Sequence, residues 1–346
     1  MTRWSIESDL ADIFEHTAAV WETMRGARIF MTGGTGFIGC WLLESLRYAE
    51  ERQPLDIKVT VLTRNADAFA AKAPHLASFR AFTFIVGDVR DFTLKSAGFT
   101  HLIHAATDAS ADLNENNPLK MFDTVLTGTR TALNFAVENK IPRVLYLSTG
   151  AIYGQQPWEM ERVPETWSGA PDCTNARNAY AEGKRAAEML CAIYRAQFGL
   201  SITTARIFAL LGPYISLDIH FAAGNFIRDA MAGKPVIVNG NGMPVRSYMY
   251  AGDLTTWLWH LLARGADGAA YNVGSDEGIS IRDLARVVSA TVGNGEFIVR
   301  DAFEKGWNPG RYVPETKRAA TELGLFTAVS LEDAIRRTAM WNGWKQ

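Results

Sequence analysis

The sequence predicts an α/β fold: a doubly wound parallel sheet, followed by a smaller mixed α/β lobe towards the C-terminal end. Strand-like apolar segments alternate with helix-like segments through the first half of the chain, as they do where helices cover both faces of a parallel sheet. A cluster of glycines lies between the first predicted strand and the helix after it. After about residue 207 the alternation becomes irregular, and loop-rich stretches separate the helices.

The strand-like segments of the first half are short and apolar, which is typical of buried parallel strands. We predict strands at 28–33, 57–64, 82–88, 101–107, 143–150 and 201–208. The predicted helices among them span 39–51, 121–139 and about 179–198. Short connections and right-handed crossovers then give a doubly wound sheet. We expect a helical extension (1–26), a dinucleotide-binding domain (27–206) and the smaller lobe (207–346), with strands exchanged between the last two.

Residues 1–26 are predicted to form one amphipathic helix, because apolar side chains recur there at helical spacing. The residues that can share one face are Leu10, Ile13, Phe14, Val20, Trp21 and Met24. Acidic residues run through the segment, so it does not resemble a secretory signal. The apolar face either packs on the chain's own domain or makes a dimer contact.

The composition is that of an ordinary globular protein. The 346 residues are 48% apolar and 21% charged, with a net charge of −2 and no basic block, so neither a nucleic-acid partner nor a membrane span is predicted. Three scattered cysteines are too few for a disulfide framework or a zinc site and indicate a reducing, cytoplasmic location. We interpret His101 and His104 as structural and predict no metal site. Trp257 and Trp259 are expected in the core, because their spacing is helical.

The pattern Gly33-x-x-Gly36-x-x-Gly39 predicts a dinucleotide site, with a purely structural turn as the alternative. Glycine permits a tight turn, lets a pyrophosphate approach the backbone and lets the helix pack closely on the strand. The start of the following helix offers free N–H groups and a partial positive charge to the phosphates.

The segments after the second and third strands are expected to meet the adenosine end of the coenzyme. Thr63 and Arg64 stand where an acid that binds the ribose of NAD is usual. A guanidinium there suits the 2′-phosphate of NADP, although Arg64 stacked on adenine, or simply solvated, is the alternative. Asp88 and Val89 are placed to reach the adenine edge, with a plain loop carboxylate as the alternative.

Tyr180 and Lys184 lie four residues apart on a predicted helix and therefore on one face of it. A nearby ammonium is expected to lower the tyrosine pKa, so that the phenol can exchange a proton with a substrate hydroxyl at neutral pH. The alternative is one packed ring and one solvated amine. The position of the pair, on the helix after a predicted strand of a dinucleotide-binding domain, favours the catalytic interpretation.

Eight motifs follow one another from about residue 27 onwards: TGGTGFIG, GDVRD, HAA, LSTGAIYG, YAEGK, RIFALLGP, RSYMYAGDL and YNVGS. Their order and spacing resemble the extended short-chain dehydrogenase/reductase family, and within it the NAD(P)-dependent nucleotide-sugar epimerases and dehydratases. The resemblance implies a Rossmann domain, a nucleotide-sugar-binding lobe and a nucleoside-diphosphate sugar as substrate. It also implies a homodimer through the helices at 121–135 and 179–190, with Ala181, Met189 and Ile193 as candidate contacts.

The resemblance assigns three groups of site residues. The catalytic residues are Thr149, Tyr180 and Lys184, where Lys184 also holds the nicotinamide ribose. The coenzyme, NAD or NADP, contacts Gly33, Thr35, Gly36, Phe37, Ile38, Gly39, Arg64, Asp88, Val89, Ala105, Ala106, Tyr180 and Lys184. The substrate contacts Thr149, Asn225, Arg246 and Arg311, of which the last three face the pyrophosphate.

One departure from the family pattern guides the functional prediction. Dehydratases of the family carry Asp and then Glu after the catalytic hydroxyl, and decarboxylases tend to keep the Glu, but this chain has Gly150 and Ala151. Such small residues are expected to leave space over the nicotinamide. We therefore predict an epimerase that oxidises a sugar carbon transiently, C4 being the expected one, with Tyr180 as acid/base. The alternative is a net oxidoreductase, a 4-keto-sugar reductase or a 4-dehydrogenase; a dehydratase, a decarboxylase and a non-catalytic dinucleotide sensor are less well supported.

Overall fold

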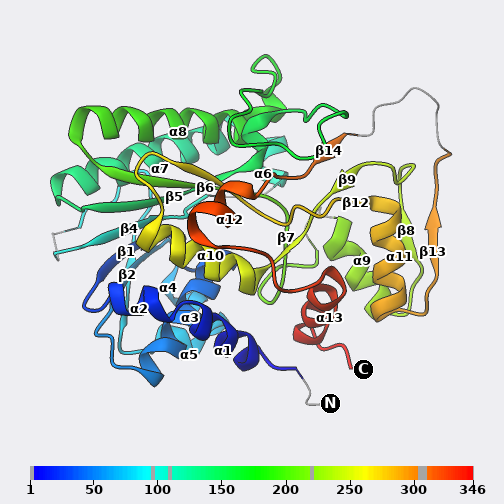
Figure 1. Cartoon of the computed structure of the whole chain (residues 1–346), viewed down its shortest axis with the longest axis horizontal. Helices are drawn as coiled ribbons and strands as arrows, with labels where there is room; N and C mark the ends of the chain where they lie inside the picture. Colours follow the sequence, from blue (N-terminus) through cyan, green and yellow to red (C-terminus); the bar gives the residue numbers. More distant parts are fainter. Residues whose placement is uncertain (1–3, 95–97, 108–110, 219–221, 303–309, 346) are drawn as a thin grey trace.

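The computed structural model describes residues 4–94, 98–107, 111–218, 222–302 and 310–345, and it is built around a seven-stranded sheet (Figure 1). The strands lie in the order β11-β6-β5-β4-β1-β2-β3, and all their pairings are parallel. Their bounds are β1 (Arg28–Thr32), β2 (Lys58–Thr63), β3 (Phe82–Val86), β4 (His101–His104), β5 (Arg143–Thr149), β6 (Ser201–Ile207) and β11 (Ala270–Val273). This confirms the predicted doubly wound sheet. The strand order reverses between β1 and β4, and ligands bind at such switch points.

Helices cover both faces of the sheet, as Figure 1 shows. Helices α7 (Pro118–Glu138) and α8 (Ala179–Phe198) pack on one face, and α3 (Phe37–Arg52) and α10 (Ala251–Arg264) pack on the other. The strands are apolar towards both layers: in β5, Val144 belongs to the core under α7 and α8, whereas Leu145 belongs to the core on the opposite face. The remaining helices of this domain are α4 (Ala66–Lys72), α5 (Pro74–Ala77), α6 (Ala111–Asn116), η1 (Gly150–Tyr153) and η2 (Ala176–Asn178).

The N-terminal extension forms two helices, α1 (Ile6–His16) and α2 (Ala18–Thr23), so the prediction of one helix is wrong. The helix is interrupted at Thr17, which has φ −110° and whose hydroxyl donates to the carbonyl oxygen of Ile13. The predicted apolar face is nevertheless buried, for example at Leu10 and Trp21. It packs against α3 and α10 of the same chain, which confirms the first of the two alternatives for this face.

The smaller lobe contains short strands and helices around its own apolar cluster. Its helices are α9 (Ala222–Met231), α11 (Ile281–Val292) and α13 (Leu331–Trp341), whereas α12 (Lys317–Leu323) packs on β11 of the main sheet. Its strands are β7 (Leu210–Leu211), β8 (Val236–Val238), β9 (Val245–Arg246), β10 (Met249–Tyr250), β12 (Ile279–Ser280), β13 (Phe297–Val299) and β14 (Arg311–Tyr312). β14 pairs in parallel with β9, so that Tyr312 lies opposite Arg246. Between these segments, α10 and β11 return to the main sheet.

Two further predictions concern buried side chains. Trp257 and Trp259 are at most 1% exposed, which confirms that they belong to the core. His104 is buried between the hydroxyls of Thr32 (2.7 Å) and Thr129 (3.0 Å), and burial lowers its pKa to about 3. This neutral, fully engaged imidazole fits the structural interpretation.

The outer surface of α8 bears on the predicted homodimer. Met189 is 62% exposed and Ile193 is 38% exposed, so both are available for a partner. Ala181 is buried against the rest of its own chain, and its prediction as a dimer contact is therefore wrong. Among the described residues no helix is both long enough and apolar enough to cross a bilayer.

Candidate functional site

The glycine-rich loop joins β1 to α3, and its glycines meet different surroundings. Gly33 has φ +76°, and a Cβ there would lie 2.6 Å from the backbone of Ala105. A Cβ on Gly39 would lie 2.4 Å from Gly34, so α3 packs directly on the loop. At Gly36 the nearest atom of the described chain is the Gly33 oxygen, 3.4 Å away, and the residue is exposed. The backbone at Gly36 is therefore open to a ligand.

The start of α3 leaves backbone donors for that ligand. Within the part of the chain that the structure describes, no side chain caps this helix, so its first N–H groups and partial positive charge remain available to an anion. Thr35, Phe37 and Ile38 form the same turn and are partly buried. The residues present thus fit the pyrophosphate of a dinucleotide coenzyme.

Charged side chains gather beside this turn, where β2 and β3 end. The hydroxyl of Thr63 lies 3.4 Å from that of Thr35, which joins the end of β2 to the glycine loop. The Asp88 carboxylate accepts two hydrogen bonds from the Arg90 guanidinium, both of 2.8 Å. These bonds hold the pKa of Asp88 at about 2, and the charge of Arg64 contributes to this. Asp88 would have to share its carboxylate between Arg90 and an adenine.

Val89, Ala105 and Ala106 occupy the neighbouring loops. Val89 is buried against α7, where a Cβ on Gly128 would lie 2.9 Å from a Val89 methyl group. The Ala106 N–H donates to the hydroxyl of Thr32 at 3.2 Å. The Val89 side chain thus packs in the core, whereas the backbone of Ala105 and Ala106 forms a wall against the glycine loop.

Thr149, Tyr180 and Lys184 come together at the carboxyl end of β5. Thr149 is the last residue of that strand, and Tyr180 and Lys184 lie one turn apart on α8. The Thr149 hydroxyl lies close enough to the Tyr180 phenol to lower its pKa, and it accepts the N–H of Ala151 at 3.2 Å. The Lys184 ammonium donates to the carbonyl oxygen of Leu147 at 2.7 Å. The three predicted catalytic side chains are therefore neighbours.

Burial dominates the electrostatics of this cluster. It raises the pKa of Tyr180, and the neighbouring Thr149 hydroxyl lowers that pKa in return. Burial also lowers the pKa of Lys184 to about 7. Lys184 was expected to lower the pKa of Tyr180, but it is not among the groups that shift that pKa. The reason is that a buried amine with a pKa near neutrality is only partly charged.

The expected space at Gly150 is filled, so that prediction is wrong. A Cβ on Gly150 would lie 2.5 Å from the ring of Phe208, which follows β6 and is 4% exposed. The Phe208 ring in turn packs against the tilted ring of Tyr312, with 4.5 Å between ring centroids. The ring of Phe208, which comes from a different part of the chain, thus fills the space that a side chain at position 150 would occupy.

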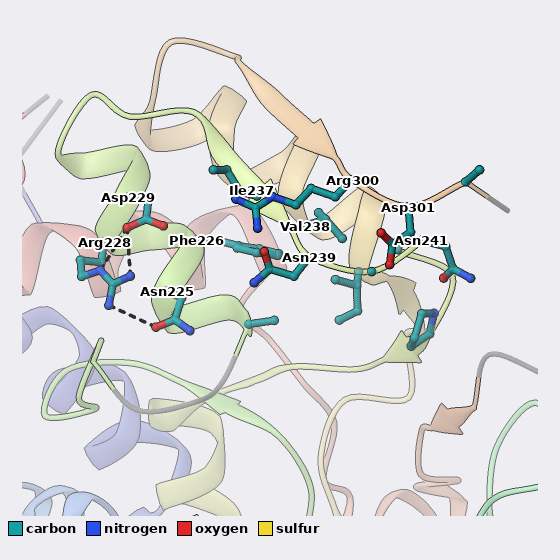
Figure 2. Close-up of a pocket in the computed structure, with 16 residues that line it drawn as sticks. Asn225, Phe226, Arg228, Asp229, Ile237, Val238, Asn239, Asn241, Arg300 and Asp301 are labelled. Carbon is teal, nitrogen blue, oxygen red and sulfur yellow. Dashed lines mark hydrogen bonds and ion pairs between the residues drawn. The ribbon is translucent and has the colours of Figure 1, made fainter.

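A pocket of about 990 Å³ opens in the smaller lobe (Figure 2). Figure 2 shows Asn225 and Arg228 on α9 at one side and Asn241 and Asp301 on loops at the other. The Arg228 guanidinium donates to the Asn225 side-chain oxygen at 3.3 Å. Amide groups, a guanidinium and an apolar floor that includes Val238 offer both polar and apolar contacts to a nucleotide.

The predicted substrate residues have different neighbours in the structure. Asn225 lines the pocket in the smaller lobe. Arg246 lies close enough to Tyr312 for its charge to lower the pKa of that phenol. Arg311 stacks over the ring of Trp158 at 4.5 Å, and its buried Nε has no hydrogen-bond partner among the described residues.

Sequence reasoning missed Tyr312 and Phe208. The Tyr312 hydroxyl lies 3.5 Å from the Thr149 hydroxyl, although the two residues are far apart in the sequence. Phe208 lies within the motif RIFALLGP and Tyr312 follows Arg311, but neither position reveals the contact with Gly150 or Thr149, because these contacts depend on how β6 ends and how β14 pairs with β9. The described residues contain no group of His, Cys, Asp or Glu side chains that could hold a metal ion.

Comparisons with known proteins show which family this chain resembles. Residues 29–274 match the model of the NAD dependent epimerase/dehydratase family. UDP-glucuronic acid decarboxylase 1 of Xenopus tropicalis is 30% identical over 312 residues, which are 90% of this chain and 71% of that protein. The dTDP-glucose 4,6-dehydratase of Streptomyces venezuelae, solved with NAD and TYD bound, has a TM-score of 0.75 and 25% identity, covering 91% of this chain and 96% of its own.

A third similar protein carries a different activity in its name. The UDP-glucose 4-epimerase of Thermus thermophilus, solved in complex with NAD, has a TM-score of 0.74 and 26% identity. The match covers 91% of this chain and 99% of that one. Decarboxylase, dehydratase and epimerase relatives thus resemble this chain to similar degrees.

Proposed function

The chain belongs to the NAD dependent epimerase/dehydratase family of enzymes, and from that premise we propose that it is a nucleotide-sugar epimerase. Its reaction is a transient oxidation and reduction at one sugar carbon, C4, with Tyr180 as the acid/base. Proteins of this family that resemble the chain include decarboxylases, dehydratases and epimerases. The proposal selects among these three reactions.

One observation favours the epimerase reaction: an aromatic ring lies against the position at which dehydratases carry the acid for water elimination. Gly150 contributes no carboxylate, and its missing side chain faces Phe208 at 2.5 Å. Ala151 contributes no carboxylate either. Loss of water requires groups that move protons at two carbons, whereas a reversible oxidation at one carbon requires only the Tyr180 cluster.

The chain's own residues move one proton and hold the substrate. Tyr180, as phenolate, takes the proton from the sugar hydroxyl and later returns it, while the Thr149 hydroxyl hydrogen-bonds the same sugar oxygen. Lys184 holds the nicotinamide ribose, and Asn225, Arg246 and Arg311 hold the pyrophosphate. A bound nicotinamide coenzyme supplies the acceptor and the donor of the hydride.

The test is incubation of the purified protein with UDP- and dTDP-hexoses and with UDP-glucuronic acid, followed by chromatography and mass spectrometry. An epimerase gives an isomer of unchanged mass and no net change in the absorbance of reduced nicotinamide. Tyr180→Phe should lower this turnover by roughly 10²- to 10⁴-fold, the usual contribution of acid–base catalysis. Loss of CO₂ or of water from a substrate would contradict the proposal and assign the corresponding activity instead.

The second candidate is a net oxidoreductase, a 4-keto-sugar reductase or a 4-dehydrogenase, and Arg64 favours it. A guanidinium at the end of β2 suits NADP, the form of the coenzyme that net reductions commonly use. If this candidate is correct, turnover consumes or forms reduced coenzyme in a one-to-one ratio with product.

We also propose that Arg64 determines the preference of the chain for NADP over NAD. Replacing Arg64 by Asp should raise the KM for NADP by roughly tenfold or more and leave the KM for NAD equal or lower, because a carboxylate repels the 2′-phosphate and accepts hydrogen bonds from the ribose. Steady-state kinetics or coenzyme titration by fluorescence measures both constants. An equal effect on the two coenzymes would show that Arg64 does not face the 2′-position.

A further inference from the structure

The Arg311 side chain, which the proposed function assigns to the pyrophosphate, is held through the face of its guanidinium. The guanidinium carbon lies over the Trp158 ring, 4.5 Å from its centre. The buried Nε has no hydrogen-bond partner among the described residues. A guanidinium carries all of its N–H donors in its own plane, so a ring on its face leaves those donors to other partners. A buried donor of this kind fits an acceptor that a ligand brings.

Trp158 and Arg311 come from different lobes of the molecule. Trp158 lies in a turn that follows η1 in the Rossmann domain, and Arg311 begins β14. Gln156, which is 2% exposed, fastens this turn to β14. Its side-chain oxygen accepts the N–H of Val313 at 2.9 Å, and its side-chain nitrogen donates to the carbonyl oxygen of Met160 at 2.7 Å. The indole is therefore brought to the guanidinium by backbone and amide contacts that do not involve the ring.

Arg311 has neighbours at both ends of the proposed substrate site. It pairs with Val245 in the parallel ladder of β9 and β14, and Val245 follows Pro244, which lines the pocket of the smaller lobe shown in Figure 2. On its other side it precedes Tyr312, whose hydroxyl lies 3.5 Å from that of Thr149. A nucleotide with its base in the pocket and its sugar at the catalytic cluster would bring its pyrophosphate to this part of the chain.

We propose that Trp158 is a positioning residue for substrate binding: its indole holds the plane of the Arg311 guanidinium so that the N–H donors of Arg311 meet the pyrophosphate. The inference rests on the proposed function for the role of Arg311. A free arginine side chain has many rotamers, and a phosphate must select one of them. With the guanidinium held on the indole, less of this freedom is lost when the phosphate binds, and two parallel donors can meet two phosphate oxygens.

The test is binding of UDP and dTDP to the purified full-length chain, measured by isothermal titration calorimetry. Trp158→Leu keeps an apolar side chain and removes the aromatic face. We expect it to raise the Kd for the diphosphates roughly fivefold, within the range of one cation–π contact. Uridine and thymidine have no phosphate, so their Kd in ligand-observed NMR should stay within about twofold of the original value. Trp158→Phe keeps a ring and should recover part of the affinity.

A double-mutant cycle then asks whether Trp158 acts through Arg311. Arg311→Met removes the guanidinium and keeps a long side chain. In that background, adding Trp158→Leu should leave the Kd for UDP and dTDP unchanged, because the indole no longer has a donor to position. Losses of affinity that simply multiply in the double variant would mean that the two residues act independently, and they overturn the inference.

The matched control is Trp167→Leu. Trp167 is a second indole of the same connecting segment, and it packs on the apolar cluster that contains Val163 and Phe208. Its replacement should lower the free energy of unfolding and leave the ratio of nucleoside to diphosphate affinity in place. If Trp158→Leu behaves like this control, or if it weakens nucleosides and diphosphates by the same factor, the ring has only a structural role and the inference is overturned.

These measurements need no turnover, which separates this inference from the proposed function. If the unaltered chain binds UDP or dTDP but isomerises no nucleotide sugar, the proposed reaction fails, and the double-mutant cycle still decides the role of Trp158. If the chain is an epimerase and Trp158→Leu leaves the Kd for both diphosphates unchanged, this inference alone fails. Binding of neither diphosphate by the unaltered chain also overturns it.

Discussion

Individual side chains in the site differ from their free counterparts chiefly because they are buried. Lys184 is 3% exposed, and burial lowers its pKa to about 7, so its charge changes within the neutral range. Burial also raises the pKa of Tyr180, and the Thr149 hydroxyl lowers it in return. Among the described residues, Thr149 is thus the neighbour that opposes the effect of burial on this tyrosine.

Gly150→Ala tests the contact with Phe208. The added methyl group must displace the Phe208 ring from 2.5 Å, and overpacking of this kind costs about 1 to 3 kcal/mol of the free energy of unfolding. Adding Phe208→Leu should recover part of the loss, because the smaller side chain vacates the space. Urea denaturation measures all three variants.

Gly240→Ala is the control for that experiment, since no described atom lies within 4 Å of the position of its Cβ. Its unfolding free energy should stay within about 0.5 kcal/mol of the original value. Gly150→Ala with the same small effect would mean that Phe208 moves aside freely.

One buried carboxylate joins the N-terminal helix α1 to the smaller lobe, in addition to the apolar contacts of Leu10 and Ile13. Asp9 is 3% exposed; it accepts hydrogen bonds from Trp4 (3.1 Å), from Tyr250 of β10 (2.5 Å) and from Arg337 of α13 (2.5 Å). Burial raises the pKa of Asp9, and these donors lower it. Helix α1 thereby joins two segments of the smaller lobe that lie far from it in sequence.

Asp9→Asn should therefore destabilise the protein by about 3 kcal/mol, because it leaves the Arg337 guanidinium without its charged partner in a largely buried place. Guanidinium chloride unfolding measures the change. Asp12→Asn, on the exposed side of the same helix, should alter stability by less than about 0.5 kcal/mol. Equal effects of the two substitutions would show that the Asp9 cluster does not fix the helix.

For the molecule as a whole, the first question is its assembly. We predict a homodimer through the outer surface of α7 and α8, where the apolar side chains of Leu119, Met189 and Ile193 are exposed. Met189→Glu together with Ile193→Glu should convert dimer to monomer in sedimentation analysis. Phe326→Glu, at an exposed apolar position elsewhere, is the control, and a monomeric parent chain would refute the prediction.

Stability of the whole molecule should also depend on pH through Asp253. Its carboxylate accepts the N–H groups of Ala328 and Val329, both at 3.1 Å, and burial raises its pKa from 3.8 to about 6. Between those values the folded chain holds a proton that the unfolded chain has lost, so the contribution of Asp253 to stability falls as pH rises from about 4 to 6 and is gone above that range.

Asp253→Asn keeps an oxygen acceptor and removes the titration. Relative to this variant, the original protein should lose about 3 kcal/mol of unfolding free energy between pH 4 and pH 6, which is 1.36 kcal/mol for each unit of pKa difference. Taking the difference between the two chains cancels His104, whose lowered pKa acts in the opposite direction. A difference that does not change with pH would contradict the raised pKa.

The sequence by itself determined the α/β class, the strands of the first half, the glycine turn and the pair Tyr180–Lys184. All of these depend on local patterns: the period of apolar residues, glycines between a strand and a helix, and residues one helical turn apart. The break at Thr17 escaped detection because it interrupts one apolar face without changing the composition.

Only the tertiary structure decided what surrounds the catalytic tyrosine. Phe208 fills the space beside Gly150, and Tyr312 reaches Thr149, because β6 ends and β14 pairs as they do. The low charge of Lys184 likewise follows from its burial rather than from its spacing to Tyr180. Distances between segments remote in sequence, and the solvent excluded between them, are properties of the packed chain.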